Sequence, residues 1–449
     1  MGKYHFIAIG GIGMSGLAKY LLEDGHIVSG SDIEDSKYIS KLRDLGATIF
    51  IGHNAQNVPN DAIIIKSTAI RDTNPEVIKS KELGLKIYHR SDLLAEIAQM
   101  AQNDGMKFIG FSGTHGKTTT SGMASFVLEN AGLQPSFVDG GIVPQINTNA
   151  QHKQGDCFVA ELDESDGTIV KYSPDILVIN NLEEDHLDFY KNGMIDILET
   201  FKNAISQAKK VIVNIDDNGN KLLKGNFITF GLNKADYTAK NIEYSSDGTK
   251  FDIFYKDEFL TSIQIQLTGK HNIYNTLAVV SALKEAGVEL CKVEKYFYDF
   301  TGMGRRFQKI TELNGIQVFD DYAHHPTEIK ATLEAASIKF GKENIIAVFQ
   351  PHRYTRLQGL WTEFLNSFES ASRVIVTDVY SASEDAIEGI NGENFAKQLN
   401  NGEHLSGSIE DVAKKMLPSL KKGDVVIGLG AGTITTLGKY IEKVGCFAN

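Results

Sequence analysis

The sequence predicts an α/β protein of three domains, each built on a mainly parallel sheet. Short β-branched runs alternate with helical patterns almost throughout the 449 residues, which is typical of βαβ units. This alternation restarts around three different loops, and the chain is too long for one core. We expect a Rossmann-like N-terminal domain (1–103), a central P-loop ATPase-type domain (104–304) and a Rossmann-like C-terminal domain (305–449).

The composition excludes several classes of function. A net charge of -12 argues against a general nucleic-acid or membrane-surface binder, because polyanions would be repelled. The N-terminus leads into a strand pattern without a basic leader, and no stretch approaches the roughly 20 apolar residues that span a bilayer. The cysteines (Cys157, Cys291 and Cys446) are far apart and lack metal-ligand spacing, so we expect idle thiols. These features predict a cytoplasmic protein with no nucleic-acid or membrane partner. The expected assembly is a monomer or weak homodimer, which the composition itself does not determine.

The first expected domain opens with a strand over 6–9, a glycine motif and a helix over 14–22. The motif is Gly11-x-Gly13-x-x-Gly16, which lets the backbone approach a diphosphate at a helix N-terminus. Asp32 follows the next strand, at 27–29, where an acid can meet a ribose hydroxyl. The pattern predicts a nucleotide site but leaves NAD, FAD and a UDP-sugar open, with a tight packing turn as the structural alternative.

The second expected domain carries a phosphate-binding loop. Gly113-Thr114-His115-Gly116-Lys117-Thr118 lies between a strand over 107–111 and a helix over 119–130. Backbone amides would cradle phosphates, Lys117 would reach the β and γ oxygens, and the Thr118 hydroxyl could ligate Mg²⁺. Because Phe111 stands where the common motif has glycine, we interpret the loop as a shortened P-loop that binds ATP.

Two metal-ligand candidates follow at neighbouring strand ends. Glu161 ends a strand over 156–161, and His186 comes soon after a strand over 175–180. The carboxyl ends of parallel strands meet at one edge, so both are expected near Thr118, in a site for Mg²⁺ with Mn²⁺ as the alternative. Glu164, in the acidic stretch that follows, is interpreted as part of a surface cluster.

The remaining elements complete the three blocks. A strand over 210–214, a β-rich stretch from about 226 to 268 and a helix over 271–285 close the second. In the third, strands are expected over 316–322, 344–350, 373–380 and 424–429.

In order, these motifs resemble the Mur ligase family, over nearly the whole chain, and within it the branch that adds L-alanine. The motifs that carry the resemblance are His5–Gly16, Gly113–Thr119, Ala160–Gly167, Asn181–Asp188, Gly269–Asn275, Gly304–Phe307, Asp320–Glu328 and Phe349–Arg356. The last two motifs, and His115 in place of the asparagine usual in later-acting ligases, indicate the alanine-adding branch.

The resemblance implies a ligase that uses ATP to join L-alanine to UDP-N-acetylmuramate in peptidoglycan precursor synthesis. It assigns three of the positions to catalysis, namely Lys117, His324 and Arg306. The implied UDP-sugar group is Gly11, Gly13, Gly16 and Asp32, with Ser67 and Asn149. The implied ATP group is Gly113, Thr114, His115, Gly116, Lys117, Thr118, Thr119, Asn272, Asn275, Arg306 and Asp321. The implied amino-acid group is Tyr322, His324, His352, Arg353 and Arg356, and the implied metal ligands are Thr118, Glu161 and His186.

The chemistry of these residues agrees with the roles that the resemblance implies. An amine attacks a carboxylate only after activation, and phosphorylation by ATP gives an acyl phosphate. His324 is a candidate base for the amine proton, and two arginines, Arg353 and Arg356, suit the carboxylate of a small amino acid. We expect His325 to be a packed or capping histidine, assign nothing to Lys202, and leave Glu384 open because its surroundings depart from the family pattern.

Three alternatives compete with this interpretation. An NAD-dependent oxidoreductase would explain the N-terminal glycines but not the ATP loop. A sister ligase would attach a preformed murein tripeptide to the same UDP-sugar, and the motif Pro351–Arg356 argues against it. A non-catalytic nucleotide sensor would not need Lys117, Glu161 and His186 together.

Overall fold

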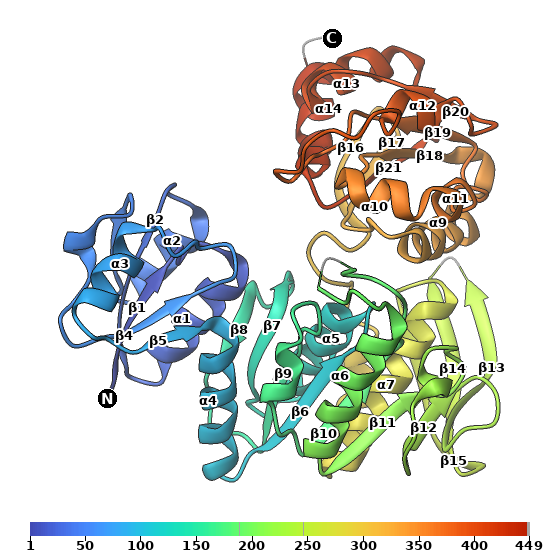
Figure 1. Cartoon of the computed structure of the whole chain (residues 1–449). Helices are drawn as coiled ribbons and strands as arrows, with labels where there is room; N and C mark the ends of the chain where they lie inside the picture. The colour runs from blue at the N-terminus through green and yellow to red at the C-terminus, as the bar shows by residue number, and fades with distance from the viewer. Residues whose placement is uncertain (188, 246, 447–449) are drawn as a thin grey trace. The chain divides into compact units, whose positions relative to one another are not determined.

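The computed structural model describes residues 1–187, 189–245 and 247–446. In these residues the strands form three β-sheets, with helices connecting many of the strands. The predicted fold class is confirmed. The chain contacts group into two compact units: Met1–Ile242 with Phe251–Gln264 and Tyr274–Phe300, and Glu243–Lys250 with Ile265–Ile273 and Thr301–Asn449. The five-stranded sheet and most of the ten-stranded sheet belong to the first unit, and the six-stranded sheet belongs to the second (Figure 1). The domain boundaries drawn from the sequence stay predictions.

The N-terminal sheet is entirely parallel, with strand order β3-β2-β1-β4-β5. The strand order reverses at β1, so the loop after β1 opens at a switch point of the kind that binds nucleotides in open α/β sheets. The strands are β1 (Lys3–Ile7), β2 (Ile27–Asp32), β3 (Thr48–Ile51), β4 (Ile63–Lys66) and β5 (Ile87–His89). The helices are α1 (Ile12–Glu23), α2 (Lys37–Asp44), α3 (Pro75–Glu82) and α4 (Arg90–Asn103).

The central sheet has the order β15-β14-β13-β12-β11-β10-β6-β9-β7-β8. Its middle strands β10, β6 and β9 run parallel and are almost completely buried, which explains their continuous apolar runs. The strands are β6 (Lys107–Ser112), β7 (Ser136–Val143), β8 (Thr148–Gln151), β9 (Cys157–Glu161), β10 (Ile176–Ile179), β11 (Lys210–Asn214), β12 (Ile228–Gly231), β13 (Tyr237–Ser245), β14 (Gly248–Tyr255) and β15 (Glu258–Ile265). The helices are α5 (Lys117–Asn130), α6 (Met194–Gln207), α7 (Lys270–Ala286) and α8 (Leu290–Val293).

The third sheet, with order β16-β17-β21-β18-β19-β20, carries a separate hydrophobic cluster on each face. Alternate residues of β18 divide between the clusters, Ala347 in one and Ile346 in the other, as the two-residue period of a strand requires. The strands are β16 (Gln308–Leu313), β17 (Ile316–Asp321), β18 (Ile345–Phe349), β19 (Arg373–Val376), β20 (Gly402–His404) and β21 (Val425–Leu429). The helices are α9 (Pro326–Phe340), α10 (Tyr354–Gly359), α11 (Trp361–Leu365), α12 (Gly392–Ala396), α13 (Ile409–Met416) and α14 (Leu437–Cys446).

The helices and the cysteines bear on the membrane and disulfide questions that the composition raised. In the described part of the chain, each helix is too short or too polar to cross a bilayer. Cys157 is buried and Cys291 is exposed, and both are free thiols.

Candidate active site

The N-terminal glycine motif spans the end of the turn after β1 and the start of α1, because Gly13 and Gly16 already lie in the helix. Gly11 caps α1 with extended backbone, and the amide of Gly10 donates to Oδ2 of Asp32 at 2.8 Å. Asp32 ends β2, so the acid that the sequence placed near a ribose also holds the glycine turn. Gly13 is open, because a Cβ there would meet nothing within 4 Å.

Asn149 reaches this motif from β8. Its Nδ2 donates to the carbonyl of Ile12 at 2.7 Å and would lie 2.7 Å from a Cβ on Gly16. A side chain at position 16 would therefore displace Asn149, which explains the glycine. Ser67 directly follows β4, the neighbour of β1 on the other side of the switch point. The predicted UDP-sugar residues thus come from the ends of β2 and β4, from the start of α1 and, for Asn149, from β8 of the central sheet.

The phosphate-binding loop requires its two glycines. Gly113 has φ +122 and Gly116 has φ +83, conformations that disfavour other residues. Gly116 is the N-cap of α5, which begins at Lys117, two residues earlier than predicted. A Cβ on Gly116 would lie 2.8 Å from Oδ1 of Asn275, and one on Gly113 would lie 2.7 Å from the carbonyl of Asn181. The loop therefore has no room for a side chain at either of these two positions.

Asn181 holds the loop from the end of β10, a role that our sequence interpretation missed. Its Oδ1 accepts from the amide of His115 at 2.7 Å, and its Nδ2 donates to the carbonyl of His115 at 3.1 Å. Thr114 adds a second tie, because its Oγ1 accepts from the amide of Glu183 at 2.8 Å. The available signal was an asparagine just past a strand that neighbours β6.

Lys117 is paired with Glu164, which contradicts our expectation that Glu164 lies on the surface. Nζ of Lys117 lies 2.9 Å from Oε2 of Glu164 and donates to the carbonyl of Gly113 at 2.7 Å. Glu164 is only 3% exposed, and the Tyr190 hydroxyl donates to its carbonyl. Burial lowers the pKa of Lys117, but the charges of Glu164, Asp163 and Glu161 outweigh it and raise that pKa above its usual value. The surface prediction failed because the charge that allows Glu164 to be buried comes from a distant loop.

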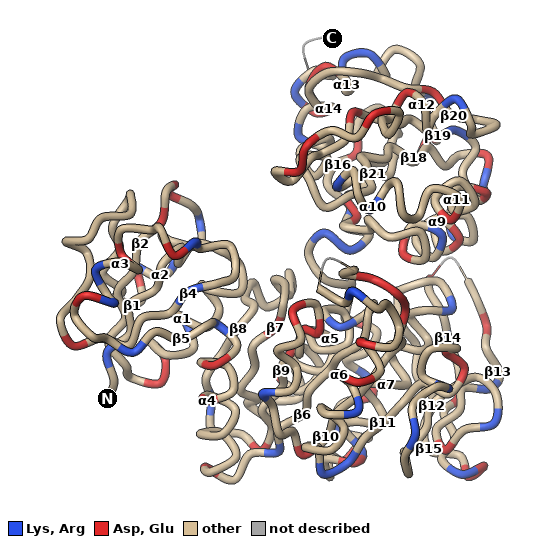
Figure 2. The backbone as a smooth tube through the Cα atoms, in the orientation of Figure 1, with Lys and Arg blue, Asp and Glu red and all other residues tan. Residues whose placement is uncertain are grey.

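The metal-ligand candidates lie on strand-end loops of the central sheet. Glu161 ends β9, and its Oε2 accepts from the amide of Gly140 at 3.1 Å. His186 has φ +54, and its Nε2 lies 3.7 Å from Oδ2 of Asp185. Figure 2 shows the acidic residues (red) on the loops beside α5. Asp188, from the same motif, lies outside the described residues.

The two asparagines predicted to read adenine are both on α7 and are both 8% exposed. In the first unit, Asn275 lies against Gly116 of the phosphate-binding loop. In the second unit, Nδ2 of Asn272 donates to the carbonyl of Thr268 at 2.8 Å. Adenine contact stays a prediction for both.

In the second unit, Arg306 and Asp321 are held by neighbours within the unit. Nη1 of Arg306 donates to Oε1 of Glu328 at 3.3 Å, and its guanidinium lies 5.4 Å from the ring centre of Tyr322. Asp321 accepts from the amides of Ala323 at 2.7 Å and Phe307 at 2.8 Å. Burial raises the pKa of Asp321 to about 6, although Arg306 acts in the opposite direction. Asp321 thus organises the loop that follows β17, and its contact with nucleotide stays a prediction.

His324 has the geometry of a proton acceptor. Its Nδ1 lies 2.9 Å from the carbonyl of Tyr322, which can only accept, so Nδ1 carries the hydrogen and Nε2 has the lone pair. Burial lowers the pKa of His324 to about 4, with Arg356 and Arg306 acting in the same direction and Glu328 against it. The ring is therefore neutral at physiological pH.

The predicted amino-acid group surrounds the start of α10. His352 stacks on Tyr380 with ring centres 5.4 Å apart, and Nη1 of Arg356 lies 3.3 Å from Nδ1 of His352. Arg353, with φ +72, directs its Nε to Oε1 of Glu384 at 2.5 Å. Glu384, which the sequence left open, thus holds Arg353.

Two other side chains were assigned no ligand. His325 is buried and is the N-cap residue of α9, although its side chain makes no capping hydrogen bond. Lys202 is 74% exposed and lies 3.4 Å from Glu199 on α6.

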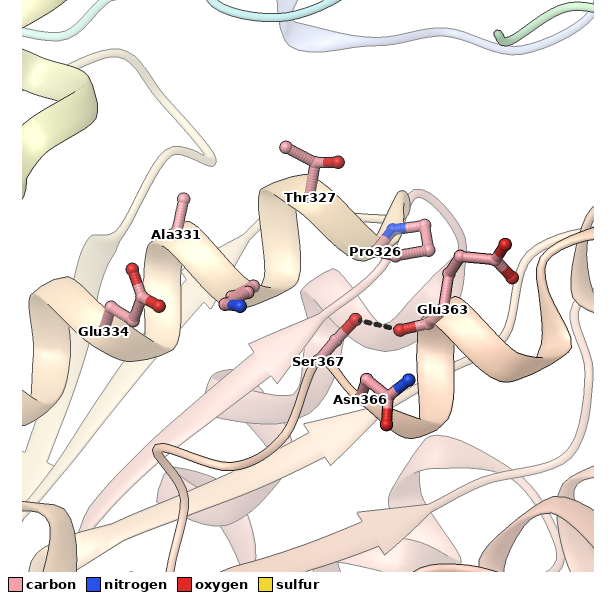
Figure 3. A pocket seen from close by; sticks show the side chains of 8 residues that line it. Pro326, Thr327, Ala331, Glu334, Glu363, Asn366 and Ser367 are labelled. Carbon is pink, nitrogen blue, oxygen red and sulfur yellow. Dashed lines mark hydrogen bonds between the residues drawn. The ribbon is translucent and has the colours of Figure 1, made fainter. Parts of the chain in front are cut away.

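The second unit also has a shallow hollow of about 400 Å³ beside α9 and α11 (Figure 3). It is lined by Pro326, Thr327, Lys330, Ala331, Glu334, Glu363, Asn366 and Ser367. None of the predicted site residues lines it.

A parallel sheet with a glycine-capped lysine loop defines a P-loop-type nucleotide-binding α/β protein. Mur ligase family models match three successive parts of the chain: the family's catalytic domain at residues 3–102, its middle domain at 111–283 and its glutamate ligase domain at 305–432. The chain belongs to the Mur ligase family.

Named relatives cover nearly the whole length. The UDP-N-acetylmuramate–L-alanine ligase of Geotalea daltonii is 41% identical over 98% of both chains, and that of Geobacter sulfurreducens is 39% identical over 98% of this chain and 97% of its own. The crystal structure of the Thermotoga maritima UDP-N-acetylmuramate–alanine ligase matches with a TM-score of 0.84 at 30% identity, covering 100% of both chains.

Proposed function

We propose that this chain joins L-alanine to the carboxylate of UDP-N-acetylmuramate, with ATP converted to ADP and phosphate. The observation that carries the proposal is Lys117 at the start of α5, whose side chain is only 13% exposed, beside two glycines that have no room for a side chain. The full-length relatives named above are ligases for these same substrates.

The first step activates the sugar-borne carboxylate. One of its oxygens attacks the γ-phosphorus of ATP, the bond from that phosphorus to the β-γ bridging oxygen breaks, and ADP leaves with an acyl phosphate behind. The Lys117 ammonium and the N-terminal amides of α5 stabilise the charge on the transferring group. Asn275 and Asn272 are proposed to contact the adenine.

A divalent cation fits the charges around Lys117. Three carboxylates, those of Glu164, Asp163 and Glu161, act on the Lys117 ammonium. Arg90 pairs with Asp163 at 2.8 Å, so two cations face three anions and one negative charge is in excess. We propose that Glu161, the Thr118 hydroxyl and His186 hold Mg²⁺, with Mn²⁺ as the alternative suited to imidazole. When bound, the ion would neutralise phosphate charge.

The second step forms the amide bond. The uncharged amine of L-alanine attacks the acyl carbon, the carbon–oxygen bond to phosphate breaks, and inorganic phosphate leaves. Nε2 of His324 is proposed to accept the amine proton, since its lone pair is available at neutral pH. Arg356 and Arg353 are proposed to pair with the alanine carboxylate.

Phosphate release from ATP tests the proposal, with UDP-N-acetylmuramate and either L-alanine or a murein tripeptide. Turnover is expected with L-alanine and Mg²⁺, and turnover with the tripeptide alone would contradict the proposal. Lys117→Ala should lower kcat by at least about 100-fold while UDP-sugar affinity changes less than about twofold. An equal loss of both would contradict two separate nucleotide sites. We also propose that the protein is cytoplasmic and is a monomer or weak homodimer. Gel filtration tests the oligomeric state.

A further inference from the structure

The N-terminal sheet buries an acid that the ligation chemistry does not use. Glu76, in the first turn of α3, is 0% exposed. Its Oε1 accepts from the amide of Asn54 at 3.0 Å and from Nδ2 of Asn57 at 2.8 Å. Its Oε2 accepts from the Ser31 hydroxyl at 2.6 Å and lies 3.2 Å from Nε2 of His5. Asn54, Asn57 and Ser31 thus donate three hydrogen bonds to the carboxylate. Burial raises the pKa of Glu76, but the hydrogen bonds from His5, Ser31 and Asn57 outweigh it and lower that pKa, so the group is an anion.

The Glu76 anion fixes the direction of the hydrogen bonds beyond it. Ser31 has one hydroxyl hydrogen, which it donates to Glu76, so its oxygen can only accept from Nδ1 of His53 at 2.8 Å. Nδ1 of His53 therefore carries a hydrogen, and in the neutral ring Nε2 is an acceptor. No hydrogen bond to this Nε2 is found within the described residues, and the side chain of His53 is 15% exposed.

His53 directly follows the turn after β3, on the side of the sheet edge where the Rossmann pattern would place the base of a nucleotide. Ile51 ends β3 in register with Asp32 at the end of β2, and the amide of Gly52 donates to the carbonyl of Asp32 at 2.7 Å. The diphosphate belongs at the glycine turn and the ribose at the end of the second strand, so the base lies further towards β3. Ile33 and Ile51, which are 70% and 50% exposed, offer apolar surface at this edge for a flat ring.

We propose that Nε2 of His53 accepts the N3 hydrogen of uracil, and that Glu76 and Ser31 are positioning residues that keep this nitrogen an acceptor. The proposal rests on the proposed function, in which the N-terminal domain binds a UDP-sugar. Cytosine has a lone pair on N3 where uracil has a hydrogen, so a cytidine nucleotide would place two acceptors face to face. The hydrogen-bonded series Glu76–Ser31–His53, called the relay below, thus selects uracil over cytosine by the position of one hydrogen.

Calorimetric Kd values for UDP and CDP at pH 8 test the contact. The unchanged chain should bind UDP at least about tenfold more tightly, because a site built around a hydrogen bond rejects a partner that cannot make it. His53→Phe should bring this ratio to within about twofold of unity. His26→Phe is the matched control, since its side chain is 12% exposed and its Nδ1 is bonded to the Gly2 amide at 2.8 Å. An unchanged ratio in His53→Phe would overturn the contact.

Glu76→Gln tests the relay itself. The Asn54 amide can only donate, so the glutamine oxygen stays beside it and the NH₂ group faces Ser31. Ser31 then accepts from this group and donates to Nδ1 of His53, which moves the ring hydrogen to Nε2. We expect the UDP preference to disappear or to reverse, and ¹⁵N NMR of the His53 ring to show the other tautomer. An equal loss of affinity for both nucleotides, with the tautomer unchanged, would overturn the relay.

The outcomes separate this inference from the proposed function. Retained UDP binding shows that the N-terminal sheet of each variant is folded, and retained binding of an ATP analogue shows the same for the central sheet. If the unchanged chain bound neither UDP nor UDP-N-acetylmuramate, the proposed function would fail and this inference with it. UDP binding with a base preference insensitive to His53→Phe contradicts only this inference.

Discussion

Nζ of Lys117 lies 2.9 Å from Oε2 of Glu164, and the two side chains are only 13% and 4% exposed. The same ammonium donates to the carbonyl of Gly113 at 2.7 Å and to that of Thr114 at 3.2 Å. The group proposed to bind ATP phosphates is therefore already bonded to its own loop and to a carboxylate. Phosphate oxygens and Glu164 compete for one cation.

Glu164→Gln should lower the free energy of unfolding of the nucleotide-free protein but should tighten ATP binding. Removal of one partner leaves the Lys117 charge buried and less compensated, at a cost of about 3 kcal/mol in the free energy of unfolding. ATP phosphates restore a partner and no longer displace an anion, so we expect Kd for ATP without Mg²⁺ to fall by about fivefold or more. Thermal unfolding with and without ATP measures both effects. The control is Glu199→Gln, which removes the exposed partner of Lys202. Weaker ATP binding in Glu164→Gln would show that Glu164 assists the phosphates instead.

His324 gives a prediction about pH. Its folded-state pKa is about 4, below the ordinary histidine value of about 6.5. The neutral ring therefore contributes stability that is fully present above the unfolded pKa and is lost as pH falls towards 4. Because the folded pKa is lowered, His324 should still be able to accept a proton throughout pH 5–7. In a pH profile of kcat, the fall in kcat that is caused by protonation of His324 should therefore lie near its folded pKa.

Replacement of His324 separates its role in catalysis from its role in stability. His324→Gln should lower kcat by about 100-fold at saturating L-alanine and leave a residual rate that rises with hydroxide concentration. The matched control is His404→Gln, which removes a histidine of the same unit whose Nε2 lies 3.0 Å from Oδ1 of Asp378. An unaltered pH profile in His324→Gln would rule out His324 as the proton acceptor.

Local patterns predicted the glycine turns well, and long-range contacts account for what was missed. Gly113, Gly116 and Lys117 are recognisable because phosphate binding needs those residue types at that spacing. Glu164 could not be recognised, because its burial depends on an ammonium 47 positions away in the sequence. The strand β7 was also missed, since Asp139-Gly140-Gly141 indicates a turn, whereas pairing with β9 on one side and β8 on the other makes the segment a strand.

Asn181 was missed for the same reason, and its replacement gives a fourth prediction. Asn181→Ala removes two hydrogen bonds to the backbone of His115, so the phosphate-binding loop loses its link to β10. We expect KM for ATP to rise about tenfold and the free energy of unfolding to fall by about 2 kcal/mol. The KM for UDP-N-acetylmuramate should stay within about twofold, because the glycine turn proposed to bind it follows β1 of another sheet. A parallel rise in both KM values would point to general loosening of the first unit.

Glu384 gives the last prediction, because it holds Arg353 in a backbone conformation that the residue alone disfavours. Arg353 has φ +72, and only its surroundings stabilise it there. The amide of Arg353 donates to the carbonyl of Tyr380 at 2.9 Å, while Glu384 accepts from Nε of Arg353 and, at 3.1 Å, from the amide of Thr355. Glu384→Ala removes the side-chain half of this support. The guanidinium should then lose its orientation towards the alanine carboxylate.

Steady-state kinetics of Glu384→Ala should therefore show a KM for L-alanine raised about tenfold, with kcat and the KM for ATP within about twofold. Glu403→Ala is the matched control, since it removes another glutamate–arginine pair of the same unit, with Arg373, away from the α10 loop. If L-alanine bound Glu384→Ala as tightly as the unchanged chain, Arg353 would not be an alanine-binding residue. The amino-acid carboxylate would then depend on Arg356, whose Nη1 already lies 3.3 Å from Nδ1 of His352.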